Sequence, residues 1–354
     1  MITEIEARGF RGLGEAHITG LSRLTVITGR NASGKSSLLE AALLGASRYP
    51  GEAAGRIVQL RGFEHGARWA IRKGEERLGA LIAVRFRDGL RVEREVFWDR
   101  FLAVDGISRA LVNRGAAGPY SAFRIYRREP PMPSGSIPEF GDRQPFSVVG
   151  FAANNDYEAA NVEGRDLRGA DVFLVKPSAG VSLHDGFSRS VQGGTRQRIV
   201  ELVRAILPEL QSIDVLTENG TPWLALTVAG VAVPASMAGD GVQAILQMAF
   251  ELARPSGAII LLEEPEVHQH PGGLRLAAKV ILDAVRGGVQ VILSTHSLEL
   301  VDALLATLSP EEVDDPSLVA LLRVRLPTDG RLLVSHNTAA EAVSARAEIS
   351  EDLR

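Results

Sequence analysis

The stretch Gly29-Arg30-Asn31-Ala32-Ser33-Gly34-Lys35-Ser36 matches the phosphate-loop pattern G-x-x-x-x-G-K-[ST]. An apolar run at residues 24–27 precedes it, and residues 37–44 after it have helical spacing and good helix formers. A strand before the loop and a helix after it are the context that this motif requires. We therefore predict that residues 29–36 bind the phosphates of a nucleoside triphosphate. The alternative is a glycine-rich turn with an incidental lysine.

The residue types of this loop fit a phosphate and a magnesium ion. Gly29 and Gly34 let the backbone turn so that consecutive N–H groups point at phosphate oxygens, and the following helix N-terminus favours an anion. Lys35 is expected to reach the β/γ-phosphates, and the Ser36 hydroxyl to bind Mg²⁺. The predicted nucleotide contacts of this region are Gly29, Arg30, Asn31, Ala32, Ser33, Gly34, Lys35, Ser36 and Ser37.

Composition limits the other classes of function. The 354 residues are 45% hydrophobic and 23% charged, which is typical of a globular protein with a sizeable core. The absence of cysteine excludes disulfides, thiolate metal sites and cysteine nucleophiles. No secretory signal begins the chain, and no apolar run approaches the about 20 residues that span a bilayer. We expect a cytoplasmic protein without membrane contact.

Apolar runs that alternate with helical patterns predict an α/β fold, with a central largely parallel sheet and helices on both faces. An antiparallel β subsheet is expected as well, since Asp88-Gly89 joins two strand-like runs. The expected strands are 2–10, 15–18, 24–28, 81–86, 90–97, 171–175, 212–217, 223–228, 230–233, 258–262 and 289–293, with helices near 37–47, 195–207 and 242–253, another before 289, and a hairpin near 328–330.

Residues 102–170 show little periodicity, and Pro130-Pro131-Met132-Pro133-Ser134-Gly135 is a loop by composition. Pro50-Gly51 is expected to end the helix that follows the phosphate loop. We interpret residues 1–354 as a single ATPase domain, in which residues 61–170 form a variable, irregular insertion.

Two adjacent carboxylates, Glu263 and Glu264, end the apolar strand at 258–262. A strand covered on both faces has no structural need for two charges at its tip, whereas ligands bind at the carboxyl ends of α/β strands. Glu263 is expected to hold Mg²⁺, and Glu264 to accept a proton from the attacking water. The alternative is a solvated strand end.

Two further stretches fit a nucleotide site. His296 follows the apolar strand at 289–293 and could donate to a γ-phosphate oxygen or to the attacking water. Gly239-Asp240-Gly241 precedes a helix, where glycines can form a second anion cradle. Taken alone, the first could be a packing or capping histidine and the second a simple turn.

Together these pieces resemble the ABC-type ATPase heads of the OLD/SMC-like group. Residues 29–36 resemble Walker A, and residues 259–264 resemble Walker B. Residues 239–243 resemble a degenerate signature loop, residues 266–271 the D-loop and residues 294–297 the segment with the switch histidine. The opening Ile5-Glu6-Ala7-Arg8-Gly9-Phe10-Arg11-Gly12 also resembles the first strand of that group. The resemblance covers about residues 1–45 and 170–310.

This resemblance implies a P-loop NTPase of the ABC-ATPase head type, which binds ATP and Mg²⁺ and hydrolyses ATP. Lys35, Glu264 and His296 would be catalytic, with Glu264 as the general base. Two copies would form a homodimer around two ATP molecules, each completed by the partner's Gly239, Asp240 and Gly241. The ATPase would act with a separate nuclease or other effector, or on DNA, in repair or phage defence. Neither a Toprim nuclease pattern nor coiled-coil heptads are evident in the chain.

Three departures from the family pattern stand out. Glu263 occupies the usual Walker B aspartate position. The signature serine position aligns with Ala238 or with Ser236. No glutamine marks a Q-loop; Val175-Lys176-Pro177-Ser178 lies near the expected place.

Residues 51–130 contain sixteen Lys/Arg and ten Asp/Glu, with interspersed aromatic side chains. These could contact nucleic acid, although we favour an ordinary solvated strand face. His268-Gln269-His270 has the wrong spacing for two metal ligands on one helix face, so we expect no metal there.

We keep two alternatives to the ATPase hypothesis. The first is a module that dimerises around ATP with little turnover and scaffolds a partner protein. The second, a transporter ATPase subunit, is disfavoured by the weak signature loop and the missing Q-loop glutamine.

Overall fold

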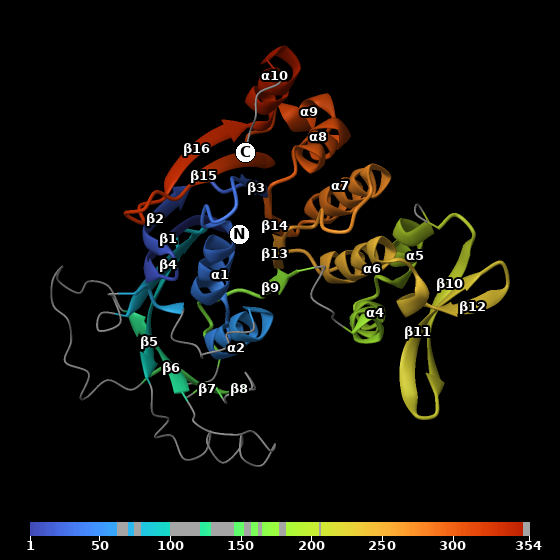
Figure 1. Ribbon diagram of the computed structural model, residues 1–354, viewed down its shortest axis with the longest axis horizontal. Helices are drawn as coiled ribbons and strands as arrows, with labels where there is room; N and C mark the ends of the chain where they lie inside the picture. Colours follow the sequence, from blue (N-terminus) through green and yellow to red (C-terminus); the bar gives the residue numbers. More distant parts are fainter. Residues whose placement is uncertain are drawn as a thin grey trace. The chain divides into compact units, whose positions relative to one another are not determined.

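The computed structural model describes residues 1–61, 70–73, 79–99, 121–128, 145–151, 157–161, 165–176, 182–204 and 207–349 (Figure 1). Internal contacts divide the chain into two compact units. Unit 1 contains Met1–Leu21, Ala32–Val172 and Val324–Val334, and unit 2 contains Ser22–Asn31, Phe173–Arg323 and Ser335–Arg354. Each unit is described in turn.

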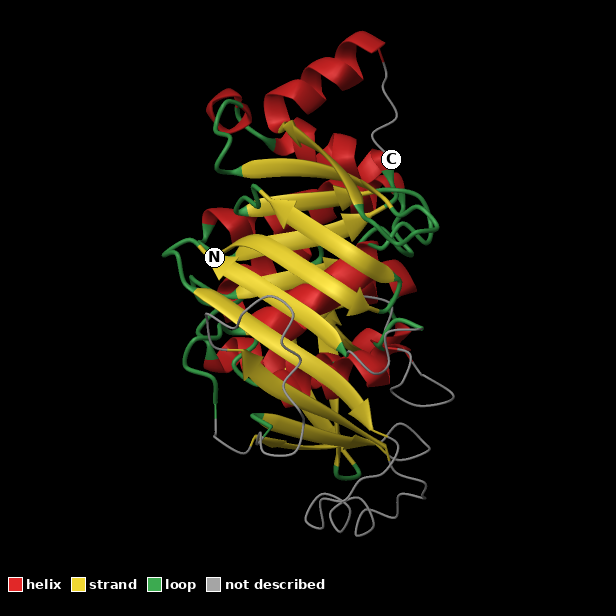
Figure 2. Cartoon of the chain, turned by 90° about the vertical axis from the view of Figure 1, so that its left-hand side faces the viewer, coloured by secondary structure: helices red, strands yellow, loops and turns green. Residues whose placement is uncertain are grey.

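Unit 1 is built on a seven-stranded sheet, whose strands face the viewer in Figure 2. Its strand order is β2-β1-β4-β5-β6-β7-β8, and every neighbouring pair is antiparallel. The strands are β1 (Ile2–Phe10), β2 (Leu13–Thr19), β4 (Ala80–Phe86), β5 (Arg91–Asp99), β6 (Ser121–Arg128), β7 (Ser147–Phe151) and β8 (Tyr157–Asn161). The expected antiparallel subsheet is confirmed. The sheet also includes β6, β7 and β8, which lie within residues 102–170, where the sequence shows little periodicity.

Two helices in unit 1 lie close together in sequence. Helix α1 (Lys35–Ala46) ends before Pro50, as expected, and Ser47 caps it through an N–H bond to the Leu43 carbonyl. The prolyl residue has a second role that the sequence analysis missed, because Pro50 is also the first residue of α2 (Pro50–Arg61). Proline is well suited to a first helical turn, where no N–H is needed for an intrahelical bond.

A buried ion pair ties α1 to the sheet of unit 1. The side chains of Arg94 (β5) and Asp166 are each 1% exposed and lie 3.1 Å apart. Arg94 also donates to the carbonyls of Leu44 and Ser47, at the C-terminal end of α1. Burial lowers the pKa of Arg94 to about 10, which still leaves it charged at neutral pH. Burial alone would raise the pKa of Asp166, but Arg94 and its other cationic neighbours bring it below the usual value.

Unit 2 is built on a six-stranded sheet of order β16-β15-β3-β14-β13-β9. The run β15-β3-β14-β13 is parallel, which confirms the expected α/β fold. The strands are β3 (Leu24–Thr28), β9 (Val172–Val175), β13 (Ile259–Glu263), β14 (Gln290–Thr295), β15 (Val319–Arg325) and β16 (Leu333–Thr338). Every residue of β3, β13 and β14 is buried, as their continuous apolar runs predict.

Among the described helices, α6 (Asp240–Leu252), α7 (Pro271–Arg286), α8 (Leu298–Thr307) and the start of α10 (Ala339–Ile349) contribute buried residues to the hydrophobic core of this sheet. Helix α7 buries Leu274, Ala278, Ile281 and Val285, which lie three or four residues apart along one face. The last helices of the chain are the short α9 (Pro310–Val313) and α10 (Ala339–Ile349).

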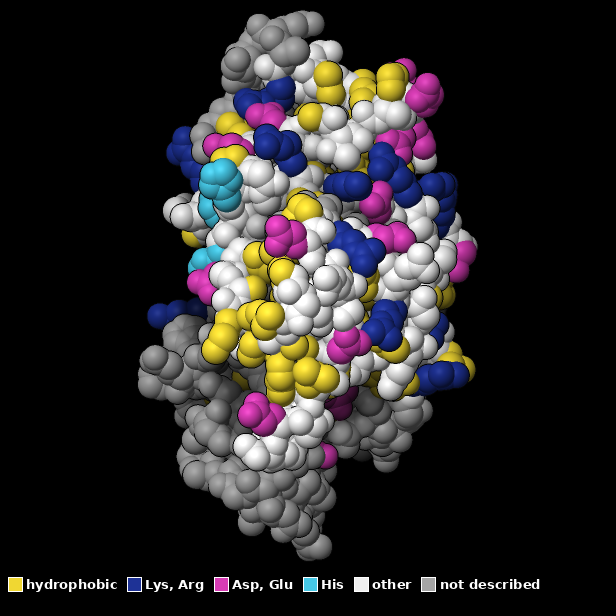
Figure 3. All heavy atoms as spheres, turned by 90° about the vertical axis from the view of Figure 1, so that its right-hand side faces the viewer, with side chains coloured by type: hydrophobic (Ala, Val, Ile, Leu, Met, Phe, Trp, Pro, Cys, Tyr) yellow, Lys and Arg dark blue, Asp and Glu magenta, His cyan; other side chains and the backbone are white. Residues whose placement is uncertain are grey.

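A second core in unit 2 lies among α4 (Leu183–Gln192), α5 (Arg196–Arg204), α6 and a three-stranded sheet. This sheet is antiparallel, with order β10 (Leu210–Glu218), β11 (Thr221–Val228) and β12 (Val231–Pro234). Asn219 and Gly220 have φ of 49° and 80°, which fits a tight turn between β10 and β11. Several hydrophobic side chains stay exposed in this sheet, and hydrophobic groups gather on the face that Figure 3 shows.

Several sequence predictions fall partly outside the described residues. These include the proline-rich loop at 130–135, part of the tract at 175–178, and the aromatic residues Trp69, Phe101 and Tyr120. The single-domain interpretation and its insertion at 61–170 stay predictions. In the part of the chain that the structure describes, no helix is long and apolar enough to cross a membrane.

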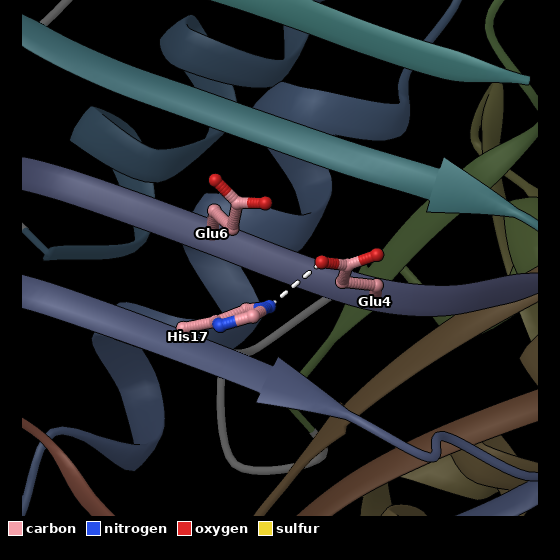
Figure 4. A group of neighbouring side chains, drawn as sticks. All are labelled: Glu4, Glu6 and His17. Atoms are coloured by element: carbon pink, nitrogen blue, oxygen red, sulfur yellow. Dashed lines mark hydrogen bonds and ion pairs between the residues drawn. The ribbon is translucent and has the colours of Figure 1, made fainter.

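Glu4, Glu6 and His17 lie together on β1 and β2 (Figure 4). Both carboxylates already have cationic partners: Glu4 lies 2.6 Å from Arg85, and Glu6 lies 2.6 Å from Arg91. His17 Nε2 lies 2.7 Å from Glu4. This group is therefore explained as an ion-pair network on the sheet.

The Arg94–Asp166 pair generates a stability prediction. Asp166→Ala should lower the free energy of unfolding by about 3–5 kcal/mol, because it leaves a buried guanidinium without its counter-charge. Asp171→Ala is the matched control, since the Arg48–Asp171 pair is exposed and should contribute within about 1 kcal/mol. Urea denaturation measures both changes. Equal losses for the two variants would contradict the prediction.

The pair Glu4–Arg85 predicts a pH dependence. The hydrogen bond from Arg85 is the largest cause that lowers the pKa of Glu4 from 4.5 to about 2. The Glu4 carboxylate therefore contributes fully to the free energy of unfolding above pH 4.5, and this contribution is lost as the pH falls from 4.5 towards 2. Glu4→Gln should flatten this part of the curve of unfolding free energy against pH. An unchanged slope in the variant would refute this assignment.

Candidate functional site

The phosphate loop leaves β3 after Thr28 and enters α1 at Lys35. Gly34 has φ 91° and directly precedes the helix, while Ala32 has φ 60°. A Cβ on Gly34 would lie 3.1 Å from a Leu13 methyl, so both conformation and space favour glycine here. The predicted strand–loop–helix context is confirmed.

Features of this loop fit a bound phosphate. No side chain caps the N-terminus of α1, so its first N–H groups are not satisfied by a capping residue. The Ser33 hydroxyl is buried and has no hydrogen-bond partner among the described residues. Arg30, Asn31 and Ala32 are exposed, whereas Lys35 is buried. A bound anion would give the Ser33 hydroxyl an acceptor.

The parallel register of unit 2 aligns the ends of three strands. Glu263 of β13 pairs with Ser294 of β14, which pairs with Ile27 of β3. One residue further on, Thr295 pairs with Thr28, directly before the phosphate loop begins. The segments after these strands therefore start at one edge of the sheet, where α/β proteins bind ligands.

Glu263 is 2% exposed at this edge. A buried carboxylate needs a cation or hydrogen-bond donors to offset its desolvation. Carboxylate and hydroxyl oxygens are the ligands that Mg²⁺ prefers, so Glu263 and Ser36 are chemically suited to hold this ion. Their roles stay predictions.

Glu264 adopts a left-handed backbone conformation, with φ 48°, directly after β13. Its N–H donates to the Ser294 carbonyl at 2.9 Å, which fixes the turn. The Glu264 carboxylate is 30% exposed, and its Oε1 lies 3.7 Å from Nδ1 of His296. Such strained, non-glycine conformations cluster at active sites. The structure thus brings together Glu264 and His296.

Glu266 has a role at this edge that the sequence analysis missed. Its Oε1 accepts a hydrogen bond from the Thr295 hydroxyl at 2.7 Å and one from the His296 N–H at 3.1 Å. In the sequence, Glu266 resembles only the start of the D-loop segment. The one available signal was a third carboxylate two residues after Glu264.

The predicted glycine loop forms the beginning of α6. Gly239 is the N-cap of α6 and carries no side chain to accept a hydrogen bond. The Gly241 carbonyl accepts a hydrogen bond from the Gln269 side chain at 3.1 Å. Gly239 and Asp240 are exposed, and Gln243 donates to the carbonyls of Ser236 and Ala238. The loop is therefore held in place while its tip stays accessible.

His270 has a structural role. Its side chain accepts from the Gly272 N–H at 3.2 Å as the N-cap of α7, with Pro271 in the first turn. Among the described residues, Glu4, Glu6 and His17 are the one group of three acidic or histidine side chains whose possible ligand atoms all lie within 4.8 Å of one another.

Comparison with known proteins agrees with this arrangement. Residues 195–302 match the family model described as "AAA domain, putative AbiEii toxin, Type IV TA system". This range includes Glu263, Glu264, His296 and the 239–241 loop. An uncharacterized protein of the archaeon Methanocaldococcus jannaschii, MJECL11, is 31% identical over 118 residues, which are 33% of this chain and 98% of that protein. Residues 195–302 of the chain therefore match an AAA domain.

Two of the solved structures that are similar to this chain are heads of SMC proteins. An SMC head bound to the C-winged helix domain of ScpA is 14% identical, with a TM-score of 0.49, over 97% of this chain and 99% of that chain. The SMC head domain from Thermotoga maritima is 12% identical, with a TM-score of 0.43, over 94% and 98%.

The residues predicted to contact a nucleotide fall in both units. Glu263, Glu264, His296 and residues 239–241 belong to unit 2, together with Gly29, Arg30 and Asn31. Ala32, Ser33, Gly34, Lys35, Ser36 and Ser37 belong to unit 1.

The packing of the glycine loop predicts that alanine substitutions at its two glycines lower the stability of the protein by different amounts. A Cβ at position 241 would lie 2.9 Å from the backbone oxygen of His268, whereas one at position 239 meets nothing within 4 Å. Gly241→Ala should therefore cost about 1–3 kcal/mol of stability by overpacking. Gly239→Ala should cost less than about 1 kcal/mol. Thermal unfolding of both variants tests this order, and equal melting temperatures would rule it out.

Proposed function

We propose that this protein is an ATPase of the AAA class, which hydrolyses ATP to ADP and phosphate. The observation that carries the proposal is the strained Glu264 at the carboxyl edge of the parallel sheet, with His296 beside it. Neither residue is needed to hold β13 or β14, because the runs before them are already buried. A partly exposed carboxylate that follows a buried one fits a proton acceptor beside a cation site.

The roles follow from the chemistry of each side chain. The loop N–H groups and Lys35 bind the phosphates, while Ser36 and Glu263 supply oxygen ligands for Mg²⁺. Mg²⁺ neutralises charge on the phosphates when bound. Glu264 orients the attacking water and accepts its proton. His296 donates a hydrogen bond to the γ-phosphate or to that water.

We further propose that two copies dimerise around ATP, with Gly239, Asp240 and Gly241 of one copy contacting the nucleotide of the other. Support comes from the exposed tip of this loop and from the uncapped N-terminus of α6, which suits an anion. The Gln269 side chain also donates a hydrogen bond to the Gly241 carbonyl, so the loop is held in its conformation before a partner binds.

An ATPase of the OLD/SMC-like kind would use this cycle to drive a partner protein, such as a nuclease, or to act on DNA. The described basic residues at 51–130 give little support to the hypothesis that the protein binds DNA. Arg61, Arg85, Arg91 and Arg94 each bond a carboxylate of the same chain. We therefore favour a protein partner.

Glu264→Gln tests the hydrolytic function. It removes the proton acceptor but keeps size and polarity, so ATP turnover should fall by about 100-fold or more. Binding of ATP, measured by calorimetry with Mg²⁺ present, should stay within a few fold. Size-exclusion chromatography with light scattering should show the variant held as a dimer in ATP.

Glu218→Gln is the matched control, because Glu218 is an exposed glutamate in β10 of the same unit. Its turnover should equal that of the unsubstituted protein. If Glu264→Gln also keeps full turnover, the general-base assignment is wrong. Absence of turnover in the unsubstituted protein would favour the scaffold that uses ATP only to dimerise.

A further inference from the structure

The carboxylate of Glu266 is built into unit 2 at an energetic cost. Its side chain is only 8% exposed, and Oε1 takes all three of its close polar contacts. The other oxygen, Oε2, is buried and has no hydrogen-bond partner in the part of the chain that the structure describes. Leaving one carboxylate oxygen in this state is unfavourable, so the residue is poorly explained as a stabilising group.

The contacts of Glu266 converge on the residues that carry His296. The Thr295 hydroxyl donates to Oε1 at 2.7 Å and also accepts from the Ser297 N–H at 3.0 Å. The His296 N–H donates to the same oxygen at 3.1 Å, and its ring Nδ1 lies 3.4 Å away. One atom thus accepts from the His296 backbone and lies close to its ring, at the point where β14 ends.

Glu266 itself is bound to the turn that carries Glu264. Its carbonyl accepts from the Gln269 N–H at 3.0 Å, and the Val267 N–H donates to the Glu264 carbonyl at 3.2 Å. The segments that follow β13 and β14 are therefore held in one relative position at this edge.

We propose that Glu266 is a positioning residue for ATP hydrolysis, which orients His296 relative to Glu264 by accepting from Thr295 and from the His296 backbone. This inference rests on the proposed function. Glu266 acts on His296 and needs no contact with the nucleotide. Because most of the proposed nucleotide contacts lie at residues 29–37, loss of Glu266 should affect turnover more than affinity.

Steady-state ATPase kinetics of Glu266→Ala and Glu266→Gln test this role. Glu266→Ala leaves two donors without their acceptor, so kcat should fall about tenfold or more, while KM for ATP stays within about twofold. Glu266→Gln retains a carbonyl oxygen that can accept from both groups. It should restore kcat to within about threefold of the unsubstituted protein.

Glu251→Ala is the matched control for loss of a buried carboxylate. Glu251 is also buried in unit 2 and bonds Arg189 and Arg254. This variant should lower the melting temperature without changing kcat, measured well below that temperature. An equal fall of kcat in Glu251→Ala and Glu266→Ala would reduce Glu266 to a structural role.

The outcomes separate the inference from the function on which it rests. If the unsubstituted protein turns over ATP and Glu264→Gln does not, an unchanged kcat in Glu266→Ala overturns the inference alone. Failure of Glu266→Gln to restore kcat overturns it as well. If the unsubstituted protein does not turn over ATP, both the proposed function and this inference are refuted.

Discussion

Parallel pairing among β13, β14 and β3 is the constraint on which the candidate site depends. The pairing sets Glu263 beside Ser294 and Ser294 beside Ile27, so three segments leave the sheet at the same edge. A shift of one residue in either pair would turn the side chains of a strand to the opposite face of the sheet. Complete burial of the three strands opposes such a shift, because each strand end is defined by where its apolar run stops.

Buried charge is used differently in the two units. In unit 1, the Arg94–Asp166 pair reaches α1 and supplies donors to the carbonyls at its C-terminal end, which favour a cation. In unit 2, Glu263 and Glu266 are buried carboxylates at a strand end. The first arrangement pairs two opposite charges and fits a structural role, although Arg94 Nε is buried without a hydrogen-bond partner among the described residues. In the second, Glu266 accepts from Thr295 and His296, which fits a positioning role, and Glu263 is chemically suited to bind a cation.

The sequence predicts the parts of this structure whose signals are local. Continuous apolar runs identify β3, β13 and β14, and the glycines of the phosphate loop identify its turn. Helix α2 is not evident from the sequence, because Pro50 indicates the end of the preceding helix and yet also begins the next one. Strand β6 carries Arg124, Arg127 and Arg128, which hide its alternation. Glu266 was undervalued because its partners, Thr295 and His296, lie 29 and 30 residues away.

The division of the chain has a consequence for experiments on its parts. Unit 1 is assembled from three separate stretches and unit 2 from three more, so the backbone passes from one to the other five times. One of these passages falls between Asn31 and Ala32, inside the phosphate loop. Neither unit can be produced by cutting the gene at a single position. Isolating either one would require joining its stretches with new linkers, and both products would carry only a fragment of the G-x-x-x-x-G-K-S motif.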